Sequence, residues 1–288
     1  MYKNTVISIF SQGYAKARLS SLCSLTSLLR AARKLVFLIT LLMHFDHTIA
    51  AGPESEKNVS TLSFKIEELY SREKLKHLNT YFPENEDLSW EVVFPRNLKK
   101  GEAKGILVYI SPIDSGAMPP QWQEVIDKER LIWISANASG NKQNSARRVL
   151  LGLLAKHIAS GYGPIDNSRN YISGFSGGGR VASMMMWEYP DSFDGAIFFS
   201  GVNKWKGNGK SFLSKLQKKR LVFLTGSRDF NEKDTKKAFS KYRRKGVTYA
   251  TYLSILGHTH SLPAAKWFSL SIQYLDCDKE EFDDCIND

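Results

Sequence analysis

Residues 171–180 read Tyr-Ile-Ser-Gly-Phe-Ser-Gly-Gly-Gly-Arg, and this stretch decides the fold of the 288-residue chain. Its first residues are typical of a β-strand, and a helical pattern begins directly after the glycines. Gly174-Phe-Ser176-Gly-Gly178 therefore lies where a strand turns sharply into a helix. Such a nucleophile elbow holds its serine in a strained backbone conformation and needs small residues two positions before and after it. A glycine-rich turn without chemistry has a similar composition, so the flanking strand and helix are what favour the elbow.

Strand-like and helix-like segments alternate along the rest of the chain. Short apolar runs predict strands at residues 90–94, 105–110, 131–135, 170–173, 196–200, 221–225 and 247–255, and helical patterns cover 145–159, 179–189, 234–245 and 264–275. Strands that are apolar throughout are covered on both faces, and alternation with crossover helices gives a mainly parallel sheet. We therefore expect an α/β fold with helices on both faces, whose ligands bind at the carboxyl ends of the strands.

A nucleophilic serine needs a base, and the base needs an acid that orients it. In a fold with this elbow they follow the serine in the order acid, then base. Only His258 and His260 follow Ser176 among the six histidines, and both lie in the loop after the last predicted strand. Asp229 is the best acid because it follows the strand at 221–225, at the edge of the sheet that also carries the serine. Chain order leaves the choice between the two histidines open.

Metal, dinucleotide and phosphate sites have no support in the sequence. The pair His258-x-His260 lacks a matching cluster of Cys, His or carboxylate residues. No G-x-G-x-x-G motif occupies a strand-to-helix turn, and Gly209-Lys-Ser211 lacks the first glycine of a phosphate-binding loop, because Lys204 stands at that position. We expect neither a metal nor a cofactor.

The segments that carry chemistry are Gly174-Phe-Ser-Gly-Gly-Gly-Arg180, Gly226-Ser-Arg-Asp-Phe-Asn231, Ile110-Ser-Pro-Ile-Asp-Ser-Gly116 and Gly257-His-Thr-His-Ser-Leu-Pro263. Together they resemble the α/β-hydrolase superfamily, in particular the secreted esterases of the polyhydroxybutyrate depolymerase and feruloyl esterase group. The likeness covers about residues 88–275. It implies the α/β-hydrolase fold and the hydrolysis of a carboxylic ester through an acyl-enzyme, without a cofactor.

The resemblance also implies a role for each residue. Ser176 is the expected nucleophile, Asp229 the acid and His260 the base. The N–H of Gly177, at the start of the helix, points at the developing oxyanion and supports it with the helix dipole. By the same resemblance, the loop after the second predicted strand supplies another oxyanion N–H, from Ile113.

Two other functions remain open: a serine peptidase of the same fold, and an interaction protein that keeps the fold without the reaction. The stretch from Gly201 to Arg220, where this superfamily often builds a cap, has room for one short helix only. We therefore expect a minimal cap and an open cleft that accepts small-molecule or polymeric esters.

The N-terminus has the layout of a secretory signal, residues 1–51. Residues 1–45 contain no acidic side chain, and basic residues precede the apolar run 35–43. This run is shorter than the roughly 20 residues that span a bilayer, so we expect no stable membrane insertion. We predict cleavage after Ala50 or Ala51 and a secreted or periplasmic protein. A mitochondrial transit peptide and a membrane anchor through residues 35–43 are the alternatives.

Removing the signal takes away six basic side chains and one acidic one, so the net charge falls from +11 to +6 and the case for a nucleic-acid partner is lost. The remaining chain divides into an N-terminal extension, residues 52–87, with a helix expected at 71–80, and an α/β-hydrolase domain, residues 88–288, with an acidic tail. Cys277 and Cys285 are an even pair that could form a disulfide in an oxidising compartment.

Overall fold

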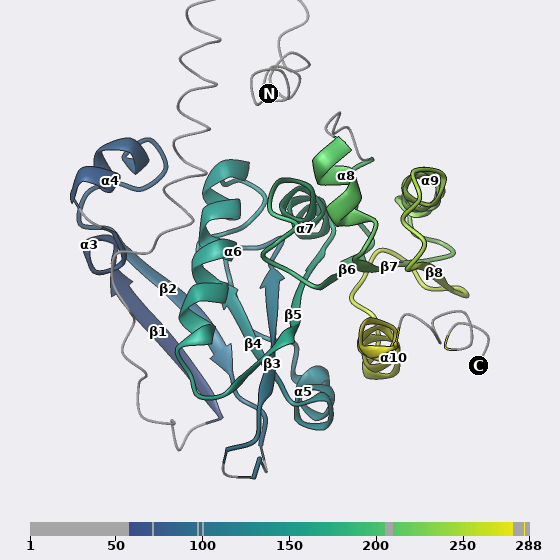
Figure 1. The fold of residues 1–288 in the computed structure, drawn as a ribbon, viewed down its shortest axis with the longest axis horizontal. Coiled ribbons are helices and arrows are strands. Elements are labelled where there is room, and N and C mark those ends of the chain that lie inside the picture. Colours follow the sequence, from purple (N-terminus) through teal and green to yellow (C-terminus); the bar gives the residue numbers. More distant parts are fainter. Residues whose placement is uncertain are drawn as a thin grey trace, which may run out of the picture.

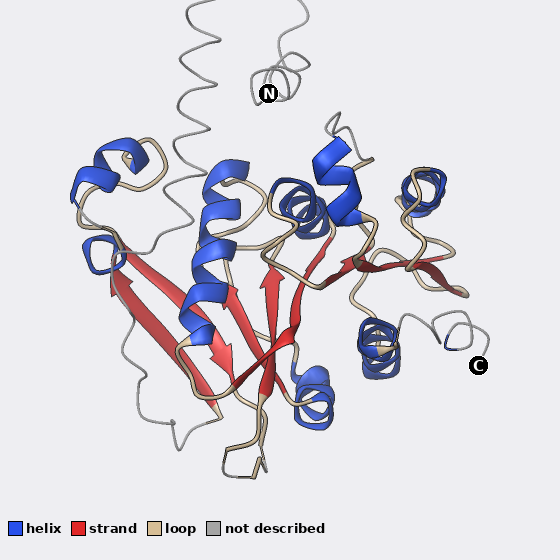
Figure 2. Ribbon diagram, viewed as in Figure 1, coloured by secondary structure: helices blue, strands red, loops and turns tan. Residues whose placement is uncertain are grey.

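The computed structural model describes residues 58–70, 72–96, 98–99, 101–204, 210–278 and 285. The expected signal, residues 1–51, lies outside the described residues, and so does most of the acidic tail. The described part of the chain folds as one twisted sheet with helices packed on both faces (Figure 1, Figure 2).

Most elements coincide with the segments expected from the sequence. The strands are β1 (Val59–Lys65), β2 (Asp87–Val93), β3 (Lys104–Ile110), β4 (Leu131–Ala136), β5 (Ile165–Phe175), β6 (Gly195–Phe199), β7 (Arg220–Gly226) and β8 (Ala250–Ile255). The helices are α3 (Ile66–Leu69), α4 (Arg72–Leu78), α5 (Gln123–Glu129), α6 (Ser145–Ser160), α7 (Gly177–Glu188), α8 (Lys210–Leu216), α9 (Glu232–Arg244) and α10 (Ala265–Asp276), with a 3-10 turn, η1 (Pro120–Trp122). β1, α3 and α5 were not expected, because β1 is mostly polar and the two helices are short.

The order of strands across the sheet is β1-β2-β4-β3-β5-β6-β7-β8. From β4 to β8 all neighbours are parallel, whereas β2 pairs antiparallel with both β1 and β4. The prediction of a mainly parallel α/β sheet is confirmed. The carboxyl ends of β5, β7 and β8 lie at one edge of the sheet, and that edge carries the expected site.

The two faces of the sheet bury different side chains, as expected for strands that are apolar throughout. On β3, Ile106 and Val108 belong to a core shared with α6, α7 and α9, whereas Leu107 and Tyr109 belong to a core shared with η1, α5 and α10. Trp122 stacks on Phe268 in the second core, with ring centroids 4.4 Å apart. Helices therefore cover both faces (Figure 2).

Residues of the expected N-terminal extension contribute to the sheet and to the core. β1 pairs with β2 over its whole length, and its side chains alternate between exposed and half-buried. From α3, α4 and the turn after them, Ile66, Leu69, Leu78 and Phe82 are buried in the first core.

The C-terminal end of α10 is tied to the strands beside it. Arg169 of β5 donates two hydrogen bonds to Asp276, at 2.8 and 2.6 Å. Cys277, the next residue, forms a disulfide with Cys285. Among the described residues, no helix combines the length and the apolar composition that crossing a membrane requires.

Candidate active site

Ser176 lies between the end of β5 and the start of α7, with φ 54° and ψ −117°. A non-glycine residue with positive φ is strained by about 1–3 kcal/mol, and such strain persists only where the surroundings enforce it. Here the N–H of Ser176 donates to the carbonyl oxygen of Phe199, at the end of the neighbouring β6, at 2.8 Å. This hydrogen bond to β6 helps to hold the strained backbone of Ser176 at the sharp turn.

The glycines around the serine are required by backbone contacts. A β-carbon on Gly174 would lie 2.5 Å from the carbonyl carbon of Gly178, and one on Gly178 would overlap the carbonyl oxygen of Ile110. Strand and helix thus approach too closely for any side chain at these two positions, as the sequence analysis expected of an elbow.

The imidazole of His260 joins the serine to a buried acid. Nδ1 of His260 lies 3.0 and 2.9 Å from the two carboxylate oxygens of Asp229, and Nε2 lies 2.9 Å from Oγ of Ser176. A carboxylate can only accept, so Nδ1 carries the ring proton and Nε2 accepts from the serine hydroxyl. In this arrangement the imidazole can take the hydroxyl proton while the carboxylate stabilises the resulting charge.

The side chain of Asp229 is fully buried, and its turn holds it in place. The N–H of Asp229 donates to the carbonyl oxygen of Gly226, and the N–H of Asn231 donates to the carboxylate at 2.7 Å. A buried carboxylate is costly unless it is hydrogen-bonded, and these groups together with His260 meet that need.

His258 has other partners. Its Nε2 lies 3.1 Å from the carbonyl oxygen of Ser261, and its own carbonyl oxygen accepts the N–H of Arg228 at 2.9 Å. The structure therefore brings His260, and not His258, to Ser176.

The two N–H groups expected to bind the oxyanion differ in their hydrogen bonding. Gly177 is the first residue of α7, where an N–H has no partner within the helix. The N–H of Ile113 donates to Oγ of Ser111 at 3.2 Å. That loop lies next to the elbow, because a β-carbon on Gly178 would also come within 3.4 Å of Ser111.

Arg148 of α6 binds the loop that follows β3. Its buried guanidinium donates to the carbonyl oxygen of Ser111 at 2.8 Å. Burial lowers the pKa of Arg148 to about 10, and the nearby Asp114 carboxylate acts in the opposite direction, so the group is charged at neutral pH. A buried positive charge therefore lies next to the backbone of this loop.

Two aromatic rings that the sequence analysis missed flank His260. The ring of Phe175 lies 4.8 Å from the imidazole and the ring of Phe230 lies 4.1 Å from it, centroid to centroid. Phe230 is 75% exposed, so it covers the imidazole from the solvent side. Its only sequence signal is its position directly after Asp229.

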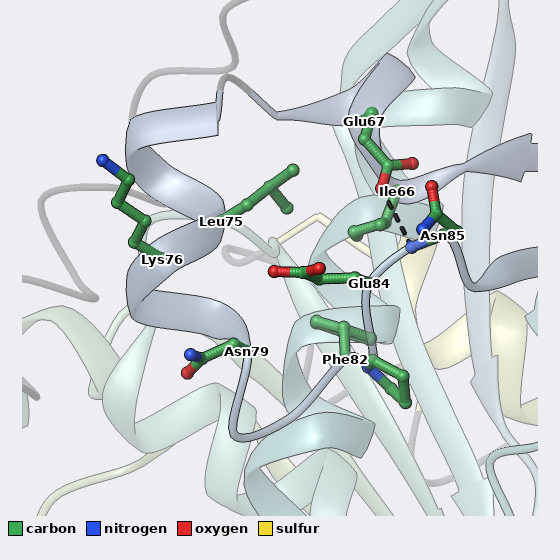
Figure 3. A pocket seen from close by; sticks show the side chains of 9 residues that line it. Ile66, Glu67, Leu75, Lys76, Asn79, Phe82, Glu84 and Asn85 are labelled. Carbon is green, nitrogen blue, oxygen red and sulfur yellow. Dashed lines mark hydrogen bonds between the residues drawn. The ribbon is translucent and has the colours of Figure 1, made fainter.

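A separate hollow of about 350 Å³ lies beside α3 and α4 (Figure 3). Its lining residues are Ile66, Glu67, Leu75, Lys76, Asn79, Phe82, Pro83, Glu84 and Asn85. The carboxylate of Glu67 accepts the N–H of Asn85 at 3.0 Å within it. None of the residues expected to act on a substrate lines this hollow.

In the described part of the chain, no group of three or more His, Cys, Asp or Glu side chains is placed so that it could hold a metal ion.

No family model matches this chain, and no curated protein matches its sequence. Solved structures share its fold. A ferulic acid esterase has a TM-score of 0.56 at 14% identity, over 76% of this chain and 99% of that one. The feruloyl esterase module from Clostridium thermocellum has a TM-score of 0.52 at 13% identity, over 81% and 94%. A putative dipeptidyl aminopeptidase IV from Bacteroides ovatus has a TM-score of 0.52 at 13% identity, over 78% of this chain but 37% of that one. The chain has the α/β-hydrolase fold, as the resemblance implied.

Proposed function

We propose that this protein is a secreted serine hydrolase that cleaves carboxylic esters, with Ser176, His260 and Asp229 as its catalytic triad. The observation that carries the proposal is the continuous hydrogen-bonded path from the serine hydroxyl, through the imidazole, to a buried carboxylate. The esterases among the structural neighbours favour an ester as the bond that is cleaved.

In this mechanism Oγ of Ser176 attacks the ester carbonyl while Nε2 of His260 takes its proton. The carbonyl oxygen becomes an oxyanion, which the N–H of Gly177 binds at the positive end of α7. The intermediate then collapses: the bond to the leaving alcohol breaks, and His260 returns the proton to it. Water, activated by the same imidazole, hydrolyses the acyl-enzyme and frees the serine.

The surroundings of the site favour esters with apolar groups, whether small or polymeric. Ile113, Phe230 and Leu256 are 64%, 75% and 93% exposed, and they lie in the loops after β3, β7 and β8. Exposed large apolar side chains gathered at one edge are typical of a binding surface.

The first prediction tests the nucleophile. Ser176→Ala should lower kcat on p-nitrophenyl butyrate by about 10⁴-fold or more and abolish labelling by a fluorophosphonate, because residues 174–179 contain no other hydroxyl. Ser173→Ala is the matched control: its buried hydroxyl, on the same strand, has no hydrogen-bond partner among the described residues, so both signals should remain. Circular dichroism confirms that each variant is folded.

Other outcomes would assign a different function. Cleavage of dipeptide anilides in place of esters would make the protein a serine peptidase. A folded wild-type protein that is neither labelled nor active on any ester would make it an interaction protein with this fold. Rates on methyl ferulate and on hydroxybutyrate oligomers, measured in the same assay, show which acyl group the enzyme prefers.

We also propose that residues 1–51 direct export and are removed, leaving the extension at 52–87 and the hydrolase domain at 88–288. The disulfide between Cys277 and Cys285 supports export, because such bonds persist in oxidising compartments.

A further inference from the structure

The space beside Gly177 is filled by the side chain of Asn141. A β-carbon on Gly177 would lie 2.6 Å from Cγ and 2.9 Å from Nδ2 of Asn141, and closer still to Oδ1. The carboxamide of Asn141 therefore lies against the α-carbon of the residue that directly follows the proposed nucleophile. Glycine at position 177 leaves room for it.

Asn141 is also fixed to the loop after β3. Its N–H donates to the carbonyl oxygen of Pro112 at 2.9 Å. The N–H of the preceding Gly140 donates to the carboxylate of Asp114, also at 2.9 Å. Asn141 thus bridges the two segments from which oxyanion donors were expected, with its side chain on one and its backbone on the other.

The carboxamide of Asn141 has unused hydrogen-bonding capacity. Asn141 is exposed, and within the described residues neither its Oδ1 nor its Nδ2 takes part in a hydrogen bond. The N–H of Ile113, in contrast, already donates to Oγ of Ser111. The donor expected from the loop is engaged, and a donor that was not expected is free beside Gly177.

We propose that Asn141 is a catalytic residue that completes the oxyanion hole, with Nδ2 donating to the substrate carbonyl oxygen beside the N–H of Gly177. This inference rests on the proposed ester hydrolysis. A half-turn of the carboxamide exchanges Oδ1 and Nδ2, so the amide can present its donor from the place that it occupies.

The chemical step makes the role of this amide explicit. As Oγ of Ser176 bonds to the carbonyl carbon, the π electron pair of the C=O bond moves onto the oxygen, and Nδ2 of Asn141 and N of Gly177 donate to it. When this pair re-forms the C=O bond, the bond from the carbonyl carbon to the leaving alkoxide breaks, and the alkoxide oxygen takes the proton from His260. The amide neither gains nor loses a proton, and it acts most strongly where the negative charge is largest.

The test separates binding of the transition state from packing. Asn141→Leu keeps a similar volume but removes the donor, so kcat on p-nitrophenyl butyrate should fall by about 10²–10³-fold with little change in KM. Oγ of Ser176 adds to the carbonyl of a trifluoromethyl ketone and forms a hemiketal oxyanion. The affinity of Asn141→Leu for such a ketone should therefore fall by a similar factor. Asn141→Asp, which also lacks the donor and adds a negative charge, should lose at least as much.

Two further variants serve as controls. Gln143→Leu makes the same chemical change two residues away, at a side chain for which no role is proposed, and should keep the wild-type kcat. Asn141→Ser shortens the side chain and provides a second measurement if the leucine variant does not fold, as judged by circular dichroism.

Wild-type kcat in Asn141→Leu or Asn141→Ser would overturn this inference and leave the proposed function intact. An equal loss of kcat in Asn141→Leu and in Gln143→Leu would show that the segment packs the site without touching the oxyanion. A higher KM in Asn141→Leu, with unchanged affinity for the ketone, would show the same. A wild-type protein without esterase activity or serine labelling would overturn both proposals at once.

Discussion

His258 and His260 are separated by one residue, yet only one of them faces the serine. We predict that His260→Ala lowers kcat on esters by about 10⁴-fold or more, because no other base among the described residues contacts the hydroxyl of Ser176. His258→Ala should keep most of the activity, since its ring contacts Ser261. Steady-state kinetics on a chromogenic ester measures both.

His258→Ala is at the same time the control for a general effect on this loop. If His258→Ala were inactive and His260→Ala active, the base would be His258, and the hydrogen bonds of His260 to Ser176 and Asp229 would have no catalytic meaning.

Chain order and strand ends pointed to Ser176 and Asp229, because these residues follow the ends of the predicted strands 170–173 and 221–225 by three and four residues. They could not separate the two histidines, since a shift of two residues within a loop changes the direction of a side chain without changing any pattern. Asn141 and Phe230 were missed for a related reason. Their contacts, with Gly177 and His260, join loops that are distant in sequence, and each is an ordinary residue in its own segment.

The connection from β6 to β7 is the element that would carry a cap, and it is short. Its second residue, Gly201, passes so close to the elbow that a β-carbon there would overlap the carbonyl oxygen of Ser176. Its helix, α8, has 7 residues, and residues 205–209 lie outside the described part. There is little chain here to cover the site.

We therefore predict that hydrolysis of a sparingly soluble ester shows no interfacial activation, because no lid has to open. The initial rate, measured across the solubility limit of the ester, should follow a smooth saturation curve. A lipase with a mobile lid, assayed in parallel, gives the expected shape of activation. A sharp rise at the limit with this protein would contradict the prediction and reveal a lid.

The sheet could be predicted where its strands are buried on both faces, and β3, β4 and β6 are examples. β1 was missed because it lies at the edge, where one face is exposed, and its alternating polar residues differ from the apolar runs used for the others. The first half of β5 is polar and partly exposed, so its predicted start, residue 170, was five residues late.

Export of the protein through residues 1–51 makes a prediction about both ends of the chain. We expect the mature protein to begin close to Gly52 and to contain no free thiol, because the only other cysteine, Cys23, is removed with the signal. Mass spectrometry with alkylation should find two modified cysteines after reduction and none before it. An intact N-terminus, or alkylation of Cys277 without reductant, would favour an anchored or intracellular protein.

Ser176 and His260 are 84 residues apart in the sequence, and His260 follows β8, the last strand of the sheet, which pairs with β7 alone. The proposed base thus follows an edge strand, and its contact with Ser176 joins residues that are distant in the sequence. Local opening begins where few contacts hold a segment, and contacts between residues distant in sequence are slow to form. We therefore expect activity to be lost at a lower temperature than the far-UV circular dichroism signal of the helices, and to recover later than that signal on refolding.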